Sequence, residues 1–181
     1  MFAVSHKNVW RTTCWLCITA VFMALNLALS SFGVPRPGAH SYTNNIIIRT
    51  AAVISDPLAA FMAGGVGAFG GDFFYPLPMF VSLATHGLQT VIISVFSHYV
   101  FKKNPVLFSG TGAAIGSVIM VTGYSLGRAF IYSTPEYAVL KLPYQILQAG
   151  VGAVVGMILC WKCKLAELFN KRTFQVRRQN F

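Results

Sequence analysis

The chain has 181 residues, of which 55% are hydrophobic and 10% are charged, and its mean hydropathy is +0.62. A water-soluble domain of this length could not bury so much apolar surface, so the composition indicates an integral membrane protein. The formal charge of +10 is explained by topology signals and anionic lipid headgroups, so we expect the lipid bilayer as a partner and no nucleic acid.

Six apolar segments are long enough, or nearly so, to cross the membrane as helices. A helix needs about 20 apolar residues to span the ~30 Å hydrocarbon core. Residues 149–155 are apolar or glycine on every face, whereas a β-barrel strand alternates in polarity. We therefore predict one all-α transmembrane domain over residues 1–181, with short second and third spans. The predicted spans are residues 11–32, 43–55, 57–74, 77–100, 104–127 and 142–162.

The first span carries alanines at a strict four-residue interval, Ala20, Ala24 and Ala28. On a helix this interval places three small side chains in one stripe, which a neighbouring helix can approach closely. We call these residues the alanine stripe and expect it to dock a partner; the alternative is that it packs against this protein's own helices. The span is longer than the apolar region of a signal peptide, so we expect it to be retained.

Basic residues give the orientation in the membrane. Ten of the fourteen lysines and arginines fall in three clusters, within residues 7–11, 102–103 and 162–178. With six spans, all three clusters lie on one side, which the positive-inside rule makes cytoplasmic. Both termini are therefore predicted in the cytoplasm, and residues 163–181 form a basic cytoplasmic tail.

Two Cys-x-x-Cys pairs lie near the predicted cytoplasmic boundary, Cys14 with Cys17 and Cys160 with Cys163. Their spacing is that of zinc or redox sites. However, both pairs lie in or beside apolar helices, where free cysteine behaves as a small hydrophobic residue, and the cytoplasm is reducing. We therefore interpret all four as packing residues and expect no metal and no cofactor.

A glycine-rich run at residues 63–71 fills the third predicted span. No strand precedes it and no lysine follows it as in a phosphate-binding loop, so close helix packing is the better interpretation. The run ends at Asp72, one of four acidic residues in the chain. An ionisable group at the end of a membrane helix usually faces the protein interior or a cavity, which makes Asp72 a candidate site residue.

Further polar and aromatic side chains converge on the outer half of the predicted bundle. Small-ligand pockets combine aromatic walls with a few placed polar groups, and this set supplies both. The tyrosines expected to wall a ligand are Tyr75, Tyr124, Tyr132 and Tyr144. The expected polar contacts come from Asp72, His86, Arg128, Gln148 and Asn44, and Tyr42, Asn45, Gln89 and Gln145 lie in the same half. Each also has an ordinary interpretation, because tyrosines populate interfacial belts and Gln or His can bond across helices.

Arg49 and Arg128 differ in their surroundings. Arginine is costly at membrane depth unless it reaches the interface or meets a partner. Tyr132 follows Arg128 by one turn, so Arg128 is placed to meet an anionic or carbonyl-bearing ligand. We expect Arg49 to pair structurally instead, with Asp72 as the candidate partner.

With these features together, the chain resembles the substrate-binding S components of energy-coupling factor (ECF) vitamin transporters. The resemblance rests on the alanine stripe, on residues 56–68, which look like that family's Gly-Pro-Leu-Ala-Gly segment and glycine-rich third helix, and on Asp72 before an aromatic and proline loop. It covers nearly the whole chain. Asp56 stands where the family usually has glycine, and residues 86–89 follow its fourth-helix pattern only loosely, which leaves the ligand class open.

The resemblance implies a multi-pass subunit of the bacterial plasma membrane that captures a vitamin outside the cell with high affinity. It would then dock through its alanine stripe on a transmembrane coupling subunit, while two cytosolic ATPase subunits hydrolyse ATP. The chain has no Walker motif of its own, which agrees with this expectation. The closest likeness is to the riboflavin-type branch that includes proposed hydroxymethylpyrimidine and pyridoxine carriers, so one of these two is the expected cargo.

Other functions stay open on the sequence alone. The cargo is alternatively another micronutrient, such as riboflavin, cobalamin, folate or a queuosine precursor. A small membrane enzyme would use Asp72, His86 and Arg128 as acid and base groups, although the chain has no recognisable nucleophile motif. A non-transport assembly subunit would neither bind nor convert a ligand.

Overall fold

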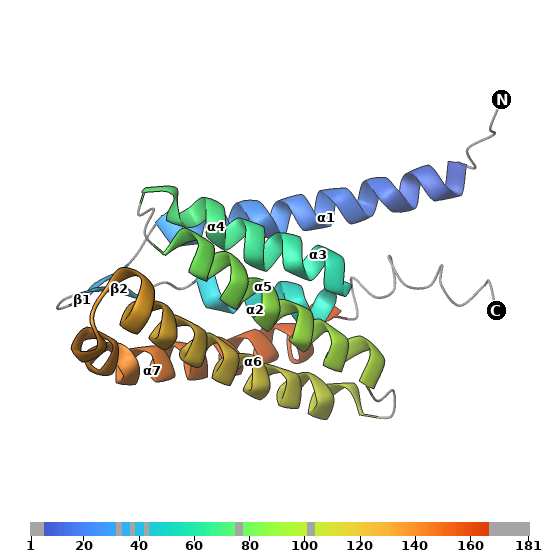
Figure 1. Ribbon diagram of the computed structural model, residues 1–181. Helices are drawn as coiled ribbons and strands as arrows, with labels where there is room; N and C mark the ends of the chain where they lie inside the picture. Colours follow the sequence, from blue (N-terminus) through green and yellow to red (C-terminus); the bar gives the residue numbers. More distant parts are fainter. Residues whose placement is uncertain are drawn as a thin grey trace.

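The computed structural model describes residues 6–31, 34–36, 39–41, 44–74, 78–100 and 104–166. Within these ranges the chain forms a bundle of helices with one small hairpin (Figure 1). The long helices are α1 (His6–Ser31), α5 (Met79–Val95), α6 (Pro105–Gly127) and α7 (Pro135–Trp161). The shorter α-helices are α2 (Asn44–Ile54), α3 (Pro57–Phe61) and α4 (Gly67–Gly71). The irregular turns that extend or link them are the π-helices η1 (Met62–Val66), η3 (Phe96–Val100) and η4 (Arg128–Tyr132), and the 3-10 turn η2 (Asp72–Phe74).

Four helical segments in the described part of the chain are long and apolar enough to cross a membrane. They are Thr12–Ser30, Met79–Val100, Ser109–Tyr132 and Pro135–Trp161. Two shorter apolar segments, Asn44–Ile54 and Pro57–Gly71, lie where the second and third spans were expected. The helical architecture is thus confirmed, and the length criterion supports four crossings directly.

The connection between the last two long helices is shorter than expected. Gly127 keeps helical backbone angles, and the chain continues through η4 to Tyr132. Helix α7 begins at Pro135 rather than near residue 142, because the Thr134 side chain accepts a bond from a backbone N–H of the first turn. Pro143 lies inside α7, although on the sequence it resembles the first residue of a helix.

A small hairpin, which the sequence did not indicate, precedes α2. Strands β1 (Val34–Arg36) and β2 (Ala39–Ser41) pair antiparallel, with Val34 opposite Ser41. The hairpin lies at the end of the bundle opposite the start of α1 and the end of α7 (Figure 1). It therefore marks the end at which the sequence places the outer loops.

Helix α2 is the buried centre of the bundle. Nine of its eleven residues are buried, and it packs against α1, α5 and α7. Ile48, Ala51 and Ala52 belong to its almost fully buried apolar side chains. Asn45 and Arg49 are equally buried, so α2 also carries polar groups into the interior.

The glycine-rich run brings α1 and α5 close to the segment η1–α4. A Cβ on Gly64 would lie 2.3 Å from the Thr90 side chain of α5, and one on Gly71 would lie 2.3 Å from the Ser30 side chain of α1. Neither position has room for a larger residue. The close-packing interpretation of the run is therefore confirmed.

Asn26 ties α1 to the π-helix η1. Its Nδ2 donates to the carbonyl oxygens of Ala63 (2.8 Å) and Gly64 (3.2 Å). A π-helix changes the usual backbone hydrogen-bond pattern, and a buried side-chain amide is a suitable partner for its carbonyls. The inner face of α1 is thus anchored by a polar contact as well as by packing.

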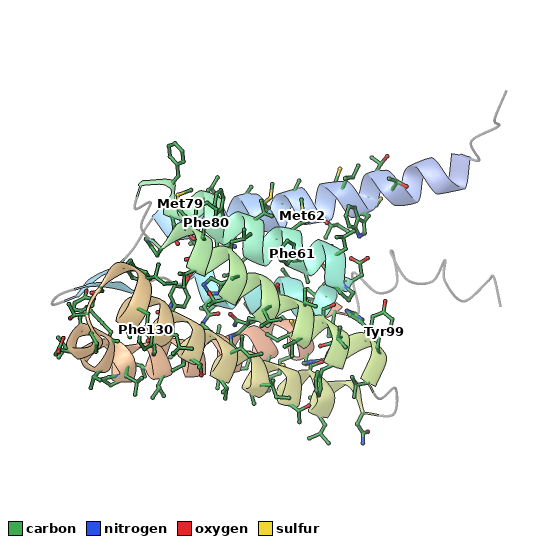
Figure 2. The ribbon with its side chains drawn as sticks, in the orientation of Figure 1. Phe61, Met62, Met79, Phe80, Tyr99 and Phe130 are labelled. Carbon is green, nitrogen blue, oxygen red and sulfur yellow. The ribbon has the colours of Figure 1, made fainter. Side chains whose placement is uncertain are left out.

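The outer surface of the bundle is apolar. Phe80, Phe130 and Val139 are 74%, 80% and 72% exposed. Figure 2 labels Phe80 and Phe130, which lie on different parts of the bundle. Apolar residues outside and polar residues inside suit a protein surrounded by lipid.

Candidate functional site

Ser82 joins two of the predicted site residues at the start of α5. Its hydroxyl donates to the carboxylate of Asp72 in η2. A serine hydroxyl has a single proton, so Tyr124 on α6 donates to Ser82 Oγ across 2.6 Å. Ser82 is buried and Asp72 is half-buried. The three side chains form a string of hydrogen bonds that ends on a carboxylate.

A second string begins at His86 and ends on α2. His86 Nδ1 donates to Gln89 Oε1 at 2.9 Å, because an amide oxygen can only accept. Gln89 Nε2 donates to Asn45 Oδ1 at 3.2 Å, and Arg49 Nε donates to the same oxygen at 3.3 Å. All four side chains are buried.

The two strings meet where the His86 ring packs edge-on against the Tyr124 ring, with centroids 5.4 Å apart. We call the seven residues Asp72, Ser82, Tyr124, His86, Gln89, Asn45 and Arg49 the polar network. It draws side chains from η2, α5, α6 and α2. Buried networks of this kind are a feature of ligand sites and ion paths in membrane proteins.

Three side-chain nitrogens near or within the polar network are buried without a hydrogen-bond partner in the described structure. They are Arg49 Nη2, Arg128 Nη1 and Gln145 Nε2, all of them donors. The Arg128 guanidinium carbon lies 5.7 Å from the Tyr124 ring centroid. Gln145 of α7 accepts from Ser125 at 3.3 Å, next to Tyr124 on α6. The site thus combines a carboxylate with free donor capacity.

The expected pairing of Arg49 with Asp72 is wrong. Asp72 accepts from Ser82, while Arg49 Nη1 donates to the carbonyl oxygen of Ala113 on α6 at 2.8 Å. Arg49 therefore reaches toward α6 and α7: a Cβ on Gly152 of α7 would lie 3.3 Å from Arg49 Nε. The sequence shows that Arg49 needs a partner but does not say which group lies opposite it.

Asn44 and Tyr144 lie at the edge of this arrangement. Asn44 is buried and its Nδ2 donates to Ser30 on α1 at 2.8 Å, so it faces the first helix. Tyr144 is 44% exposed, with the Lys141 ammonium 5.9 Å from its ring centroid. Neither residue has a hydrogen bond to the polar network among those described above.

Tyr132 and Gln148 complete the set of predicted residues that the structure describes. The Tyr132 ring packs over Gly127, where a Cβ would lie 3.2 Å from Tyr132 Cε1. Gln148 is half-buried on α7. Tyr75 and Tyr42 lie outside the described residues.

Ser82 is a member of the site that the sequence-based expectations do not include, whereas Gln145 is expected only as a polar residue of the same half of the bundle. The signal for Ser82 is its spacing, because Ser82, His86 and Gln89 follow the i, i+4, i+7 pattern of a single helix face. Gln145 is three residues before Gln148 on the same helix, and only the structure shows that it is the more buried of the two.

Asp56 makes hydrogen bonds that hold the fold together, and the described cysteines differ in their exposure. Asp56 Oδ1 accepts from Trp15 Nε1 at 3.0 Å and from the backbone N–H of Ala59 at 3.0 Å, so it caps α3 and holds α1. Cys160 is buried in the apolar core. Cys17 and Cys163 are exposed.

Comparison with known proteins gives the family. A model described as "ECF-type riboflavin transporter, S component" matches residues 11–165 of this chain. The match extends over most of the sequence and over every helix that contributes to the polar network. The chain belongs to this S-component family.

An S component of an ECF transporter is a transport subunit and not an enzyme, and it is a multi-pass protein of the plasma membrane. The family implies assembly with coupling and ATPase subunits. A protein of Pyrococcus woesei described as "Uncharacterized protein in gap 3'region" is 32% identical over 126 residues, which cover 68% of this S component and 82% of the relative.

Proposed function

We propose that this S component captures a flat heterocyclic vitamin at the polar network, with pyridoxine or hydroxymethylpyrimidine as the first candidate cargo. The observation that carries the proposal is the combination of one carboxylate, on Asp72, with buried donors that lack partners, on Arg128 and Gln145. A buried donor without a partner is costly, so a ligand acceptor placed there gains affinity. Both candidate vitamins have donors and acceptors around one aromatic ring.

The hydrogen-bonding groups on the two sides of the proposed site, Asp72 on one and Arg128 with Gln145 on the other, are complementary to such a ring. Asp72 would accept from a protonated ring nitrogen or an exocyclic amine, and Arg128 and Gln145 would donate to hydroxyl oxygens or ring nitrogens. Tyr124 and Tyr132 offer aromatic faces for stacking. The proposed site also includes His86, Tyr144, Gln148, Asn44 and Tyr75. The more exposed of these residues would contact the ligand at the rim of the site.

The size of the site fits a small ring system. Ser82 donates a hydrogen bond to Asp72, and Gln89 donates one to Asn45. These two residues of α5 are seven positions apart. Seven residues correspond to about 10 Å along a helix. A single substituted ring or a flat fused ring system is of this order in length.

Riboflavin is the second candidate cargo, because the matching family model bears its name. Its fused ring is flat and has carbonyl acceptors that suit unpartnered donors. A direct comparison of the two cargo classes therefore belongs in any binding experiment.

We propose that the alanine stripe docks the coupling subunit. Ala20, Ala24 and Ala28 are all exposed. The buried side of the same helix carries Thr19, Phe22, Asn26 and Ser30, which lie roughly 160° away around the axis at about 100° per residue. The exposure of the stripe supports docking of a partner outside the bundle, because α1 packs against the rest of this protein with the opposite face.

The orientation belongs to the same proposal. We infer six crossings, with α2 and the segment α3–α4 as the short second and third spans, and both termini in the cytoplasm. Helix α2 has 11 residues, about 16 Å of rise, so it would cross the membrane only together with residues on either side of it. Under this topology the hairpin and the polar network face the outside of the cell.

The test is uptake of radiolabelled pyridoxine, hydroxymethylpyrimidine and riboflavin by cells that express this S component. The host cells lack S components of their own for these vitamins. The coupling subunit and the two ATPase subunits, which together form the coupling module, are expressed from an inducible promoter. We expect uptake of one vitamin that depends on both this chain and the module. Uptake independent of the module, or no uptake of any of the three with a correctly inserted chain, would contradict the proposal.

A further inference from the structure

Arg49 is a buried arginine with capacity for one more hydrogen-bond partner. It is 2% exposed and lies in the middle of α2. Nε donates to Asn45 and Nη1 donates to the Ala113 carbonyl, which leaves Nη2 buried without a partner. An unsatisfied charged donor in a membrane protein interior is costly, so its retention calls for a specific reason.

No carboxylate is near enough to pair with Arg49 in the described part of the chain. Of the acidic residues described there, Asp56 bonds Trp15 and Asp72 bonds Ser82, while Glu136 is exposed at the start of α7. The two oxygens that Arg49 meets are neutral amide and carbonyl groups. Its positive charge therefore has free capacity for an anionic or strongly polar oxygen.

The surroundings hold the guanidinium in one place. A Cβ on Gly152 would lie 3.3 Å from Arg49 Nε, and one on Gly156 would lie 3.2 Å from Arg49 Cβ. Helix α7 therefore packs directly on the arginine. A planar guanidinium fixed at two of its nitrogens presents the third in a defined direction, which a flexible lysine cannot reproduce.

A purely structural link between α2 and α6 explains less. Ser117 Oγ already donates to the same Ala113 carbonyl at 2.8 Å, so this oxygen has a side-chain partner without Arg49. A neutral donor would make the same link at lower desolvation cost. The charge and the third nitrogen would then have no role.

We propose that Arg49 Nη2 binds an acidic or carbonyl oxygen of the substrate and so makes this S component selective for heterocycles that present one. This inference rests on the proposed vitamin-binding function and deepens it. The substrate class is an amphoteric heterocycle, with a donor for Asp72 and an anionic or carbonyl oxygen for Arg49. Pyridoxine meets both conditions, because its ring nitrogen takes a proton while its ring hydroxyl becomes an oxyanion.

The experiment compares pyridoxine with 3-deoxypyridoxine, in which hydrogen replaces the ring hydroxyl, by calorimetric titration of the purified full chain. We expect the unmodified chain to prefer pyridoxine by about 10- to 100-fold, the range for one hydrogen bond to a charged group. Arg49→Met should bind both compounds with the same, weaker affinity. Arg49→Lys should retain only a part of the preference.

Ser117→Ala is the matched control, because it removes the other side-chain donor to the Ala113 carbonyl and leaves Nη2 in place. It should keep the full preference for pyridoxine. If Arg49→Met does not fold, as judged by its ligand-free melting temperature, Arg49→Lys decides the question, and an undiminished preference in that variant overturns the proposal. A preference that persists in Arg49→Met, or an equal loss for both compounds, also overturns it.

Failure of the proposed function is distinguishable from failure of this inference. If the unmodified chain binds no vitamin, the function itself fails and the inference falls with it. If the chain binds hydroxymethylpyrimidine, which has no anionic or carbonyl oxygen, the proposed function stands and this inference is overturned. If the chain binds riboflavin instead of pyridoxine, Arg49→Met is titrated with riboflavin. A loss of about tenfold or more supports the inference, and an unchanged affinity overturns it.

Discussion

Asp72 is the carboxylate on which one string of the polar network ends. Asp72→Asn keeps the shape of the side chain and removes its charge, so a ligand donor loses a charge-assisted hydrogen bond. We expect the affinity for the bound vitamin to fall about 10- to 100-fold in calorimetric titration. Asp56→Asn is the control, because Asp56 caps α3 and bonds Trp15 instead. Equal losses in the two variants would contradict a specific role for Asp72.

Two glycines of α7 offer a paired test of how tightly the network is packed. A Cβ on Gly152 would lie 3.1 Å from Asn45 Cγ and 3.3 Å from Arg49 Nε, whereas one on Gly150 meets nothing within 4 Å. Gly152→Ala should weaken vitamin binding and lower the melting temperature, since α7 must move or the network must shift. Gly150→Ala should leave affinity unchanged and gain slightly in helix propensity. Indistinguishable behaviour of the two variants would show that the packing around the network is loose.

The sequence reveals which residue types need a partner more readily than which partner they find. Asp72, His86 and Tyr124 could be proposed as site residues because polar groups are rare and costly within membrane spans. Ser82 does not stand out on the sequence, because serine is common in membrane helices and readily forms hydrogen bonds with nearby backbone groups. The sequence offers Asp72 as a partner for Arg49, and only the tertiary structure shows that Asn45 and the Ala113 carbonyl lie opposite Arg49 instead.

At the scale of the helices, the close contact between α1 and α4 depends on glycines, which have no Cβ atom. A Cβ on Gly71 would lie 2.3 Å from Ser30 Cβ, whereas one on Gly70 would lie 3.2 Å from the flexible end of Leu27. We expect Gly71→Ala to lower the melting temperature by about 2–10 °C, because α1 must separate from α4. Gly70→Ala should change it far less, since Leu27 can rotate aside. Thermal unfolding in detergent measures both, and an equal effect would contradict the packing described.

The exposed face of α1 makes a separate prediction. Ala24→Trp places a large side chain in the middle of the alanine stripe and should prevent a partner helix from approaching. We expect the variant to lose co-purification with the coupling subunit while keeping its vitamin affinity. Val118→Trp is the control, because Val118 is 65% exposed on α6, away from the stripe. Assembly that survives Ala24→Trp would exclude this face as the docking surface.

Helix ends were harder to predict than helices. Pro135 and Pro143 both suit the first turn of a helix, and the bond that Thr134 accepts selects the first of them. Gly127 resembles a helix end, yet its backbone is helical and η4 follows. Residues 34–41, which contain the strands β1 and β2, include two prolines and a glycine, a composition that on the sequence is typical of a loop.

For the whole molecule, the orientation can be tested with a native thiol. Cys163 is exposed and lies two residues beyond the last residue of α7, Trp161. In a variant whose other three cysteines are replaced by alanine, a membrane-impermeant maleimide should label Cys163 in inverted vesicles and not in intact cells. Labelling in intact cells would place the carboxyl-terminal end outside and would reverse the proposed orientation.

The class of the molecule follows from its composition, because a chain this apolar requires lipid around it. The glycine spacing and the alanine stripe indicate close helix packing in a membrane, and the structure confirms this for the glycines. The polar network could not be derived in the same way. It joins residues of η2, α2, α5 and α6, and their pairing depends on how these elements pack in three dimensions.

Calorimetric titration of the purified chain with a vitamin panel tests the central claim most directly. The panel contains pyridoxine, hydroxymethylpyrimidine, riboflavin, thiamine, folate, biotin and cobalamin. The account predicts that a heterocycle of the pyridoxine, hydroxymethylpyrimidine or riboflavin type binds stoichiometrically and is recovered unchanged, and that Asp72→Asn weakens this binding. A folded, monodisperse sample that binds none of these compounds would contradict it, as would binding that Asp72→Asn leaves unaffected.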